Sequence, residues 1–319
     1  MENKKEMTAL DVSAATDTEQ PISKCTDNSI SEKAGKINDL ETISMTELYD
    51  TVYPSKPPLI DGLLYTGTYL FVGAPKLGKS YLMAQLAYHI STGTPLWDYT
   101  VRRGTVLYLA LEDDYRRLQE RLYRMFGTDS TDNLFFSVSA DSLGNGLDAQ
   151  LQRFMQEHTD TSLIIIDTLQ KVREVGGDNY SYANDYEIIT RLKQFADKYG
   201  ICILLVHHTR KQTADDKFNM ISGTTGLLGA ADGAFLLQKE KRTSNAATLE
   251  VSGRDQQDQK LYLNGNTETW LWELERTETE LWKEPPEPLR EKIAQLLSSG
   301  SNEWTGTPTE LCSILQLDI

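Results

Sequence analysis

Residues 69–80 read YLFVGAPKLGKS, an apolar run that leads directly into a loop with glycines near both ends. Gly73 to Ser80 match the pattern G-x-x-x-x-G-K-[ST], in which the backbone turns consecutive N–H groups inward to hold phosphate oxygens. A helical pattern from about Lys79 to Ser91 follows, and a helix N-terminus adds partial positive charge beside a bound anion. A glycine turn can match this pattern by chance, but a strand before it and a helix after it are the context that the motif requires. The stretch therefore predicts a phosphate-binding loop in an α/β fold.

The motif assigns a role in binding ATP and Mg2+ to the residues of this loop. Gly73 and Gly78 allow the backbone to turn. Lys79 is expected to reach the β- and γ-phosphates, and the Ser80 hydroxyl is expected to bind Mg2+. The set expected to contact the nucleotide is Gly73, Ala74, Pro75, Lys76, Leu77, Gly78, Lys79, Ser80 and Tyr81.

Short apolar runs alternate with helical patterns through the central part of the chain. Strands are expected at 69–72, 106–111, 134–138, 163–166 and 201–206, and helices at 79–91, 115–126, 147–157 and 185–198. Because the strand runs are apolar on both faces, we expect a mostly parallel sheet covered on both sides and joined by right-handed crossovers. Three later runs, at 234–237, 248–252 and 261–263, have hairpin spacing and predict antiparallel strands added to the sheet edge.

Acidic residues follow two of the expected strands. Asp167 comes directly after the aliphatic run LIII, where a carboxylate would hold Mg2+ through water; the alternative is an Asp that caps the next turn. Glu112 follows LYLAL and is expected beside the ends of the first and fourth strands, where it can polarise the water that attacks the γ-phosphate. Asp113 is its rival, Asp114 is a candidate helix cap, and a solvated acidic turn is the remaining alternative.

Two histidines, His207 and His208, end the apolar run ICILLV. A polar side chain at this strand end can contact the γ-phosphate and report hydrolysis to the loop that follows. A lone histidine in such a place is more often a core residue. An adjacent pair followed by Thr-Arg-Lys favours the polar role.

Charge and hydropathy limit the classes of protein. The formal net charge of -15 argues against a protein that coats polyanions, although a local basic groove in the centre stays open. The acidity is concentrated at the ends, because residues 1–53 carry 5 basic and 11 acidic side chains and residues 271–319 carry 4 and 10. No apolar run approaches the roughly 18 residues of a membrane span, and the N-terminal residues do not resemble a signal peptide. We therefore expect a cytoplasmic protein without membrane contact.

Four regions are expected along the chain. Residues 1–53 form a disordered acidic region with a short helix at 43–53, and residues 54–275 form the nucleotide-binding domain. Residues 276–288 are rich in charge and proline and are expected to be a linker. Residues 289–319 are expected to form a helical segment that is too small to fold stably alone.

The chain resembles the RepA-like AAA-type ATPases in five consecutive motifs, which are YLFVGAPKLGKSYLMAQLA, GTVLYLALEDDYRRLQERL, LIIIDTLQKVR, LLVHHTRK and SGTTGLLGAADGAFLL. These are RecA-fold proteins of plasmids and other mobile elements, related to hexameric replicative helicases. The resemblance covers residues 59–263. It implies that Lys79 and Ser80 are the Walker A lysine and hydroxyl, that Asp167 is the Walker B aspartate, and that Glu112 is the catalytic glutamate. His208, or less closely His207, matches the sensor position.

The same resemblance implies a site shared between subunits. Arg254, in LEVSGRDQ, lies where the family carries an arginine finger that acts on the neighbouring subunit, which implies a homo-oligomer with six subunits expected. The alternative for Arg254 is a surface arginine on an edge strand. The C-terminal stretch SNEWTGTPTELCSIL is similar to the start of a winged-helix-like module.

Two segments, residues 171–184 and 209–222, match the loops that face the central channel of RecA-fold hexamers. Basic groups with interleaved aromatic rings suit phosphate pairing and base stacking with single-stranded DNA. The side chains concerned are Lys171, Arg173, Tyr180, Tyr182, Arg210, Lys211, Lys217 and Phe218. Because both segments also contain acidic residues, ordinary surface loops are the alternative.

These features predict an ATP-driven motor that acts on single-stranded DNA in the replication of a mobile element. The alternative is a regulatory or DNA-loading ATPase that has the same site, turns over slowly and does not unwind. A small-molecule kinase is disfavoured, because no arginine-rich lid is visible between the later strands.

Overall fold

The computed structural model describes residues 42–53, 57–173, 182–209, 225–241, 243–254, 256–279 and Glu310. Contacts divide the chain between residues 54 and 55 into a small and a large unit. In the small unit, α1 spans Met45–Asp50 and begins after Ser44, which exchanges hydrogen bonds with Glu47 in a capping box. The expected disorder of residues 1–41 lies outside the described residues, as does the expected helical segment 289–319 apart from Glu310.

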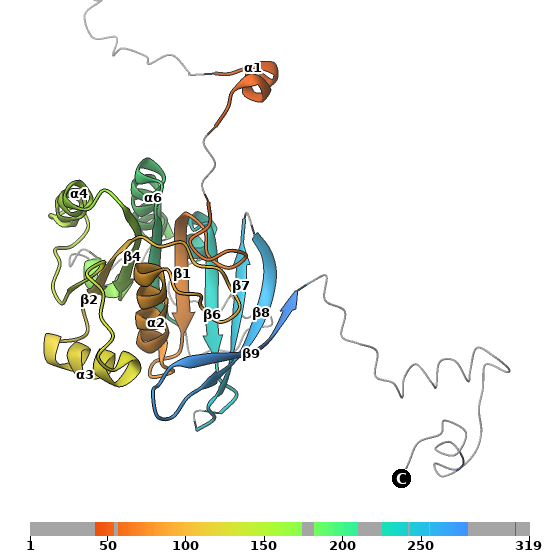
Figure 1. Ribbon diagram of the computed structural model, residues 1–319. Coiled ribbons are helices and arrows are strands. Elements are labelled where there is room, and N and C mark those ends of the chain that lie inside the picture. Colours follow the sequence, from red (N-terminus) through yellow and green to blue (C-terminus); the bar gives the residue numbers. More distant parts are fainter. Residues whose placement is uncertain are drawn as a thin grey trace, which may run out of the picture. The chain divides into compact units, whose positions relative to one another are not determined.

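The large unit is built on one nine-stranded sheet (Figure 1). The spatial order of the strands is β3-β2-β4-β5-β1-β6-β7-β8-β9, in which the first six are parallel and the remaining pairings are antiparallel. The strands are β1 (Gly67–Gly73), β2 (Thr105–Ala110), β3 (Leu134–Ser137), β4 (Thr161–Asp167), β5 (Cys202–His208), β6 (Gly233–Gln238), β7 (Ala246–Gly253), β8 (Gln256–Gly265) and β9 (Trp272–Thr279). The predicted fold class, a mostly parallel sheet with antiparallel edge strands, is confirmed.

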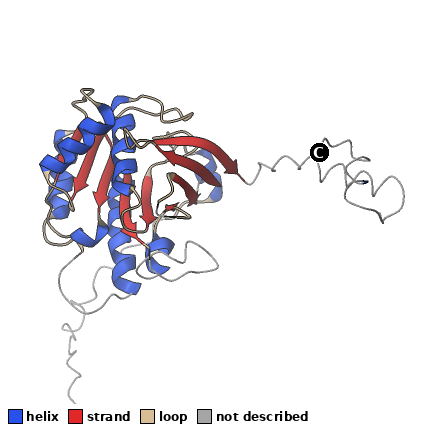
Figure 2. Cartoon of the chain, turned by 90° about the horizontal axis from the view of Figure 1, so that it is seen from below, coloured by secondary structure: helices blue, strands red, loops and turns tan. Residues whose placement is uncertain are grey.

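Helices cover both faces of the parallel strands (Figure 2). On one face lie α2 (Lys79–Thr92) and α3 (Tyr115–Phe126), and on the other lie α4 (Leu147–Glu157), α5 (Leu169–Val172), α6 (Tyr182–Tyr199) and α7 (Thr225–Ala230). Alternate side chains of one strand therefore enter different cores. In β1, Phe71 packs under α2 and Val72 packs on the opposite side. None of the described helices is long and apolar enough to cross a membrane.

Two expectations about the edge of the sheet are wrong. β6 was expected to be antiparallel, but it runs parallel to β1 with Leu237 opposite Gly73, because the connection from β5, which includes α7, brings the chain back to the starting end of the sheet before β6 begins. The linker was expected from residue 276, but β9 continues to Thr279 and pairs with β8. Arg276 and Glu278, two of the charges that suggested a linker, belong to this edge strand, and residues 280–288 lie outside the described residues.

The parallel strands bring their last residues to one edge of the sheet, at the bottom of Figure 1. Asp167 at the end of β4 lies opposite Ala110 of β2 and Val206 of β5, and Gly73 of β1 lies opposite His208 of β5. This carboxyl edge is where the sequence predicts the candidate site. Glu112, which follows β2, was expected beside the ends of both the first and the fourth strand. In the structure β2 adjoins β4 directly but is separated from β1 by β4 and β5.

Candidate active site

The glycines of the phosphate loop are required by its backbone. Gly78 has a φ of 95°, a conformation that residues with a side chain rarely adopt. At Gly73, an added Cβ would lie 2.8 Å from the carbonyl oxygen of Leu237 on β6. The loop is thus bounded by one position that needs an unusual φ and one where a neighbouring strand leaves no room. Helix α2 begins immediately after it, at Lys79.

Lys79 is buried at the mouth of the loop. Its Nζ donates hydrogen bonds to the carbonyl oxygens of Gly73 at 2.7 Å and Ala74 at 3.0 Å, and lies 3.2 Å from Nδ1 of His208. Burial lowers the pKa of Lys79 to about 8, against the opposing effect of the charges on Asp167 and Glu112. Within the described part of the chain, the ammonium group therefore contacts neutral acceptors, and a phosphate group would complete its surroundings.

Ser80 and Asp167 meet at the end of β4. The Ser80 hydroxyl donates to Oδ2 of Asp167 at 2.8 Å, and the Tyr108 hydroxyl donates to the same oxygen at 3.0 Å. Asp167 is only 5% exposed, and burial raises its pKa although both hydrogen bonds oppose the rise. Hydroxyl and carboxylate oxygens are the ligands that Mg2+ prefers, so these two side chains fit the metal that the loop motif implies.

Glu112 is the acidic side chain of its turn that is left available for catalysis. Asp113 receives a hydrogen bond from Arg121 at 2.7 Å and is paired with Arg117 at 3.5 Å, while Asp114 caps α3 by accepting from the backbone N–H of Arg117. Glu112 is exposed, and its Oε1 accepts a hydrogen bond from Thr168 Oγ1 at 3.2 Å. That contact ties the turn after β2 to the residue that follows Asp167.

The two histidines face opposite sides of the sheet. His208 points toward Lys79, and burial together with the nearby charge of Lys79 lowers its pKa, so that the ring is neutral near pH 7 and its Nδ1 accepts from the ammonium. His207 is buried and alternates with it, on the face where Ile203 and Leu205 pack. Of the pair, it is His208 whose ring lies beside Lys79, and its role as a sensor stays a prediction.

Two members of the predicted set lie elsewhere. The ring of Tyr81 packs edge-on against Trp270 with centroids 4.7 Å apart, and the guanidinium carbon of Arg121 lies 5.1 Å from the Tyr81 ring centroid. Arg254 lies at the opposite, amino edge of the sheet, where its Nη2 donates to the carbonyl oxygen of Gly229 at 3.0 Å and its side chain is 56% exposed. Arg254 is thus distant from the loop of its own chain by the length of a strand.

The expected DNA-binding loops are only partly described. Residues 174–181 and 210–224 lie outside the described residues. Arg173 does not fit the expected role, because its guanidinium pairs with Asp185 at 2.9 Å and the two side chains are 9% and 3% exposed. It is a buried partner of α6, whereas Lys171 on α5 is exposed. The contact of these loops with DNA stays a prediction.

Sequence reasoning missed three residues that support the site, namely Tyr108, Thr168 and Trp272. Tyr108 could have been found, since it is two residues before Ala110 on β2 and therefore faces the same side of the sheet as Asp167 on the adjacent strand. Thr168 and Trp272 contact Glu112 and Gly78 through the folded chain and leave no local signal.

Fold and site together define a RecA-like P-loop ATPase domain. The chain belongs to the AAA_25 family, described as an AAA domain, whose model matches residues 37–214, more than half of the chain. A search among curated proteins found no match.

Solved structures with the same fold include an isolated ATPase domain and a replicative helicase. The ATPase domain matches with a TM-score of 0.55 and 14% identity, covering 65% of this chain and 84% of that chain. A DnaB-like replicative helicase, solved to describe its interactions with primase, matches with a TM-score of 0.52 and 17% identity, covering 65% and 57%. A KaiC-like protein from Pyrococcus horikoshii matches with a TM-score of 0.50 and 14% identity, covering 68% and 94%. At these identities the likeness establishes the fold.

Proposed function

We propose that this protein is an ATP-hydrolysing motor of the helicase type, which acts on single-stranded DNA in the replication of a plasmid or another mobile element. One observation carries the ATPase part of the proposal. Lys79, Ser80, Glu112, Asp167 and His208 come from four different segments of the chain and gather at one edge of the sheet. Such a convergence of a phosphate-binding loop, two carboxylates and a polar strand end suits phosphoryl chemistry.

The residues divide into groups that bind and groups that react. The N–H groups of the loop and Lys79 would hold the β- and γ-phosphates, and Ser80 and Asp167 would hold Mg2+. The metal, when bound, supplies positive charge that offsets the charge on the phosphate oxygens. Asp167 already has both hydroxyl donors in place, so little rearrangement is needed to orient it.

Hydrolysis requires one proton acceptor. A water oxygen attacks the γ-phosphorus, the bond from that phosphorus to the bridging oxygen breaks, and Glu112 takes the proton that the water loses. Thr168 holds one carboxylate oxygen of Glu112 and leaves the other for the water. His208 contacts Lys79, so a change at the γ-phosphate would alter its surroundings and be passed to residues that follow β5.

The motor part of the proposal rests on the shared fold with a DnaB-like replicative helicase and on Arg254. Arg254 lies at the edge of the sheet opposite to its own phosphate loop and exposes more than half of its side chain. An arginine in this place cannot serve its own nucleotide, but it is suited to reach a neighbour in a ring. A hexamer with DNA in its channel would use it in this way.

A regulatory or DNA-loading ATPase that does not unwind is the second candidate, since it would use the same site. Three measurements separate the two: ATP turnover with and without single-stranded DNA, strand separation on a forked duplex, and the size of the particle with ATP. The motor predicts stimulated turnover, strand separation and a ring-sized particle. Slow turnover that DNA does not stimulate, with no strand separation, would contradict the motor and favour the loading ATPase.

A further inference from the structure

Trp272, the first residue of β9, lies against the end of the phosphate loop although it is 194 residues away in sequence. A Cβ added to Gly78 would lie 3.1 Å from Cζ2 of this indole and 3.7 Å from its Nε1. The indole N–H also donates to the carbonyl oxygen of Gly78 at 3.4 Å. Trp272 is only 4% exposed, so the ring fills the space beneath the loop.

The contact acts on the peptide unit that supplies an N–H to the site. The carbonyl of Gly78 and the N–H of Lys79 belong to one planar peptide and point in opposite directions. The Gly78 oxygen accepts from the backbone N–H of Leu82 at 3.2 Å and from the Trp272 indole at 3.4 Å. Donors that fix the direction of this oxygen also fix the opposite direction of the Lys79 N–H, which the motif assigns to phosphate oxygens.

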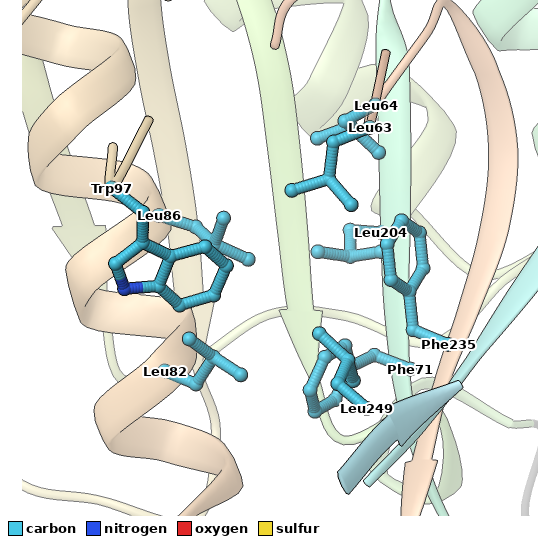
Figure 3. A pocket seen from close by; sticks show the side chains of 9 residues that line it. All are labelled: Leu63, Leu64, Phe71, Leu82, Leu86, Trp97, Leu204, Phe235 and Leu249. Atoms are coloured by element: carbon cyan, nitrogen blue, oxygen red, sulfur yellow. The ribbon is translucent and has the colours of Figure 1, made fainter. Parts of the chain in front are cut away.

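Trp272 is itself fixed to α2 through its backbone. The Gln85 side chain donates from Nε2 to the Trp272 carbonyl at 2.9 Å and accepts from the Trp272 N–H at 2.8 Å. Trp97 Nε1 donates to the same carbonyl at 2.6 Å. Figure 3 shows the Trp97 ring beside Leu82 and Leu86 of α2, in a region whose apolar lining encloses only about 10 Å³. The start of β9 is therefore anchored to α2, the helix that follows the phosphate loop.

The turn that precedes β9 is anchored to α3 as well. The guanidinium carbon of Arg124 lies 3.7 Å from the centroid of the Trp270 ring, and Arg124 Nε donates to the carbonyl oxygen of Glu268 at 2.9 Å. In Figure 1 the β8–β9 hairpin bends below the first turn of α2. The antiparallel edge of the sheet thus reaches back under the parallel half at the point where the loop ends.

We propose that Trp272 is a positioning residue of the nucleotide site, which sets the affinity for the triphosphate by holding the Gly78–Lys79 peptide in its phosphate-binding orientation. Trp272 acts through the loop and not on the reacting atoms. The proposal rests on the proposed binding of ATP. It predicts that affinity changes while the rate at saturating ATP does not, since the indole contacts the loop rather than Glu112 or Asp167.

The test is Trp272→Phe, which keeps an aromatic ring and loses the indole N–H together with the ring edge that faces Gly78. We expect ATP to bind about fivefold more weakly, which is the size expected for one net hydrogen bond, with kcat within twofold of the wild type. Amide hydrogen exchange in nucleotide-free protein should become faster in peptides that cover residues 73–82. Trp97→Phe acts one contact further from the loop, so its effects should be smaller. It should also weaken ATP binding and make amide exchange faster.

Tyr99→Phe is the matched control. It also removes one polar atom from an aromatic ring that contacts the same hairpin, because the Tyr99 hydroxyl donates to Gln259 at 3.2 Å and lies 3.4 Å from Thr277 Oγ1. This variant should bind ATP as the wild type does. A folded Trp272→Phe protein with unchanged affinity and unchanged exchange would overturn the positioning role alone. A wild-type protein that binds no ATP would overturn the proposed function instead.

Discussion

The two edges of the parallel sheet both carry buried charge, but they treat it differently. At the amino edge, the Asp232 carboxylate accepts from the backbone N–H of Thr68 at 2.9 Å, pairs with Lys193 and lies 4.0 Å from Arg254. At the carboxyl edge, Lys79 contacts two carbonyls and a neutral ring, and Asp167 contacts two hydroxyls. Within the described residues, neither Lys79 nor Asp167 forms an ion pair.

The difference distinguishes an edge suited to a charged ligand from an edge whose charges are paired within the chain. A charge that is buried without a partner of opposite sign costs free energy, and the protein shifts its pKa toward the neutral form. Burial lowers the pKa of Lys79 and raises that of Asp167, as this cost requires. At the amino edge, the Asp232 carboxylate is paired within the same chain. At the carboxyl edge, a metal-bound polyphosphate would offer negative charge to Lys79 and positive charge to Asp167.

The largest expected effect concerns Arg254, whose side chain at the amino edge is mostly exposed. If Arg254 completes the carboxyl edge of the next subunit, Arg254→Ala should lower the ATP hydrolysis rate by about 10³ and leave ATP binding intact. Mixed rings of variant and wild type should lose more activity than dilution explains. Arg153→Ala is the control, since Arg153 is an exposed arginine of α4 that pairs with Glu157 one turn away. Normal turnover by Arg254→Ala would show that Arg254 is a surface arginine without a role in hydrolysis.

Glu112→Gln tests which carboxylate at the carboxyl edge takes the proton. The amide cannot accept it, so we expect kcat to fall by about 10²–10³ while bound ATP is retained. Asp114→Asn is the matched acid-to-amide control two residues later, because asparagine caps helices as well as aspartate does. Steady-state turnover and nucleotide binding measure the two effects. Full turnover by the glutamine variant would assign the base to another residue.

Asp232→Asn tests the structural role of the amino edge. Asparagine can still accept from Thr68, but it loses the charge that Lys193 pairs with, so we expect the free energy of unfolding to fall by about 1–3 kcal/mol. Affinity for ATP should not change. Asp197→Asn removes the more exposed partner of Lys193 and should cost less than about 0.5 kcal/mol. Denaturant unfolding gives both values, and a loss of ATP affinity in Asp232→Asn would contradict the separation of the two edges.

The smallest effect is a pH dependence of binding at the carboxyl edge. Phosphate charge favours the ammonium form, so ATP binding raises the pKa of Lys79 above its free value of about 8. Affinity should therefore be full below pH 8 and fall as the pH rises through 8, by at most about tenfold per pH unit. Lys79→Arg, which stays charged throughout, should bind with no such slope. A wild-type affinity that is flat from about pH 7 to 9.5 would show that Lys79 is charged in the free protein.

The sequence predicted the parts of this arrangement that depend on local pattern. The phosphate loop, the ranges of α3 and α4, and the strand that ends at Asp167 could all be read from spacing and hydropathy. The direction of β6 could not, since it depends on the crossover before the strand. The burial of Arg173 against Asp185 and the contact of Trp272 with Gly78 depend on segments that meet only in the folded chain. Strand alternation would have linked Tyr108 to Asp167, but only once β2 and β4 were known to be neighbours.

The claim that ATP binds at the carboxyl edge is tested most directly by measuring equilibrium binding of ATP with Mg2+ to the wild type and to Lys79→Ala. Removing a buried charge from its partner costs about 2–5 kcal/mol, so the variant should bind at least about 30-fold more weakly while unfolding at a similar temperature. A folded Lys79→Ala protein that binds ATP as tightly as the wild type would mean that the nucleotide lies elsewhere.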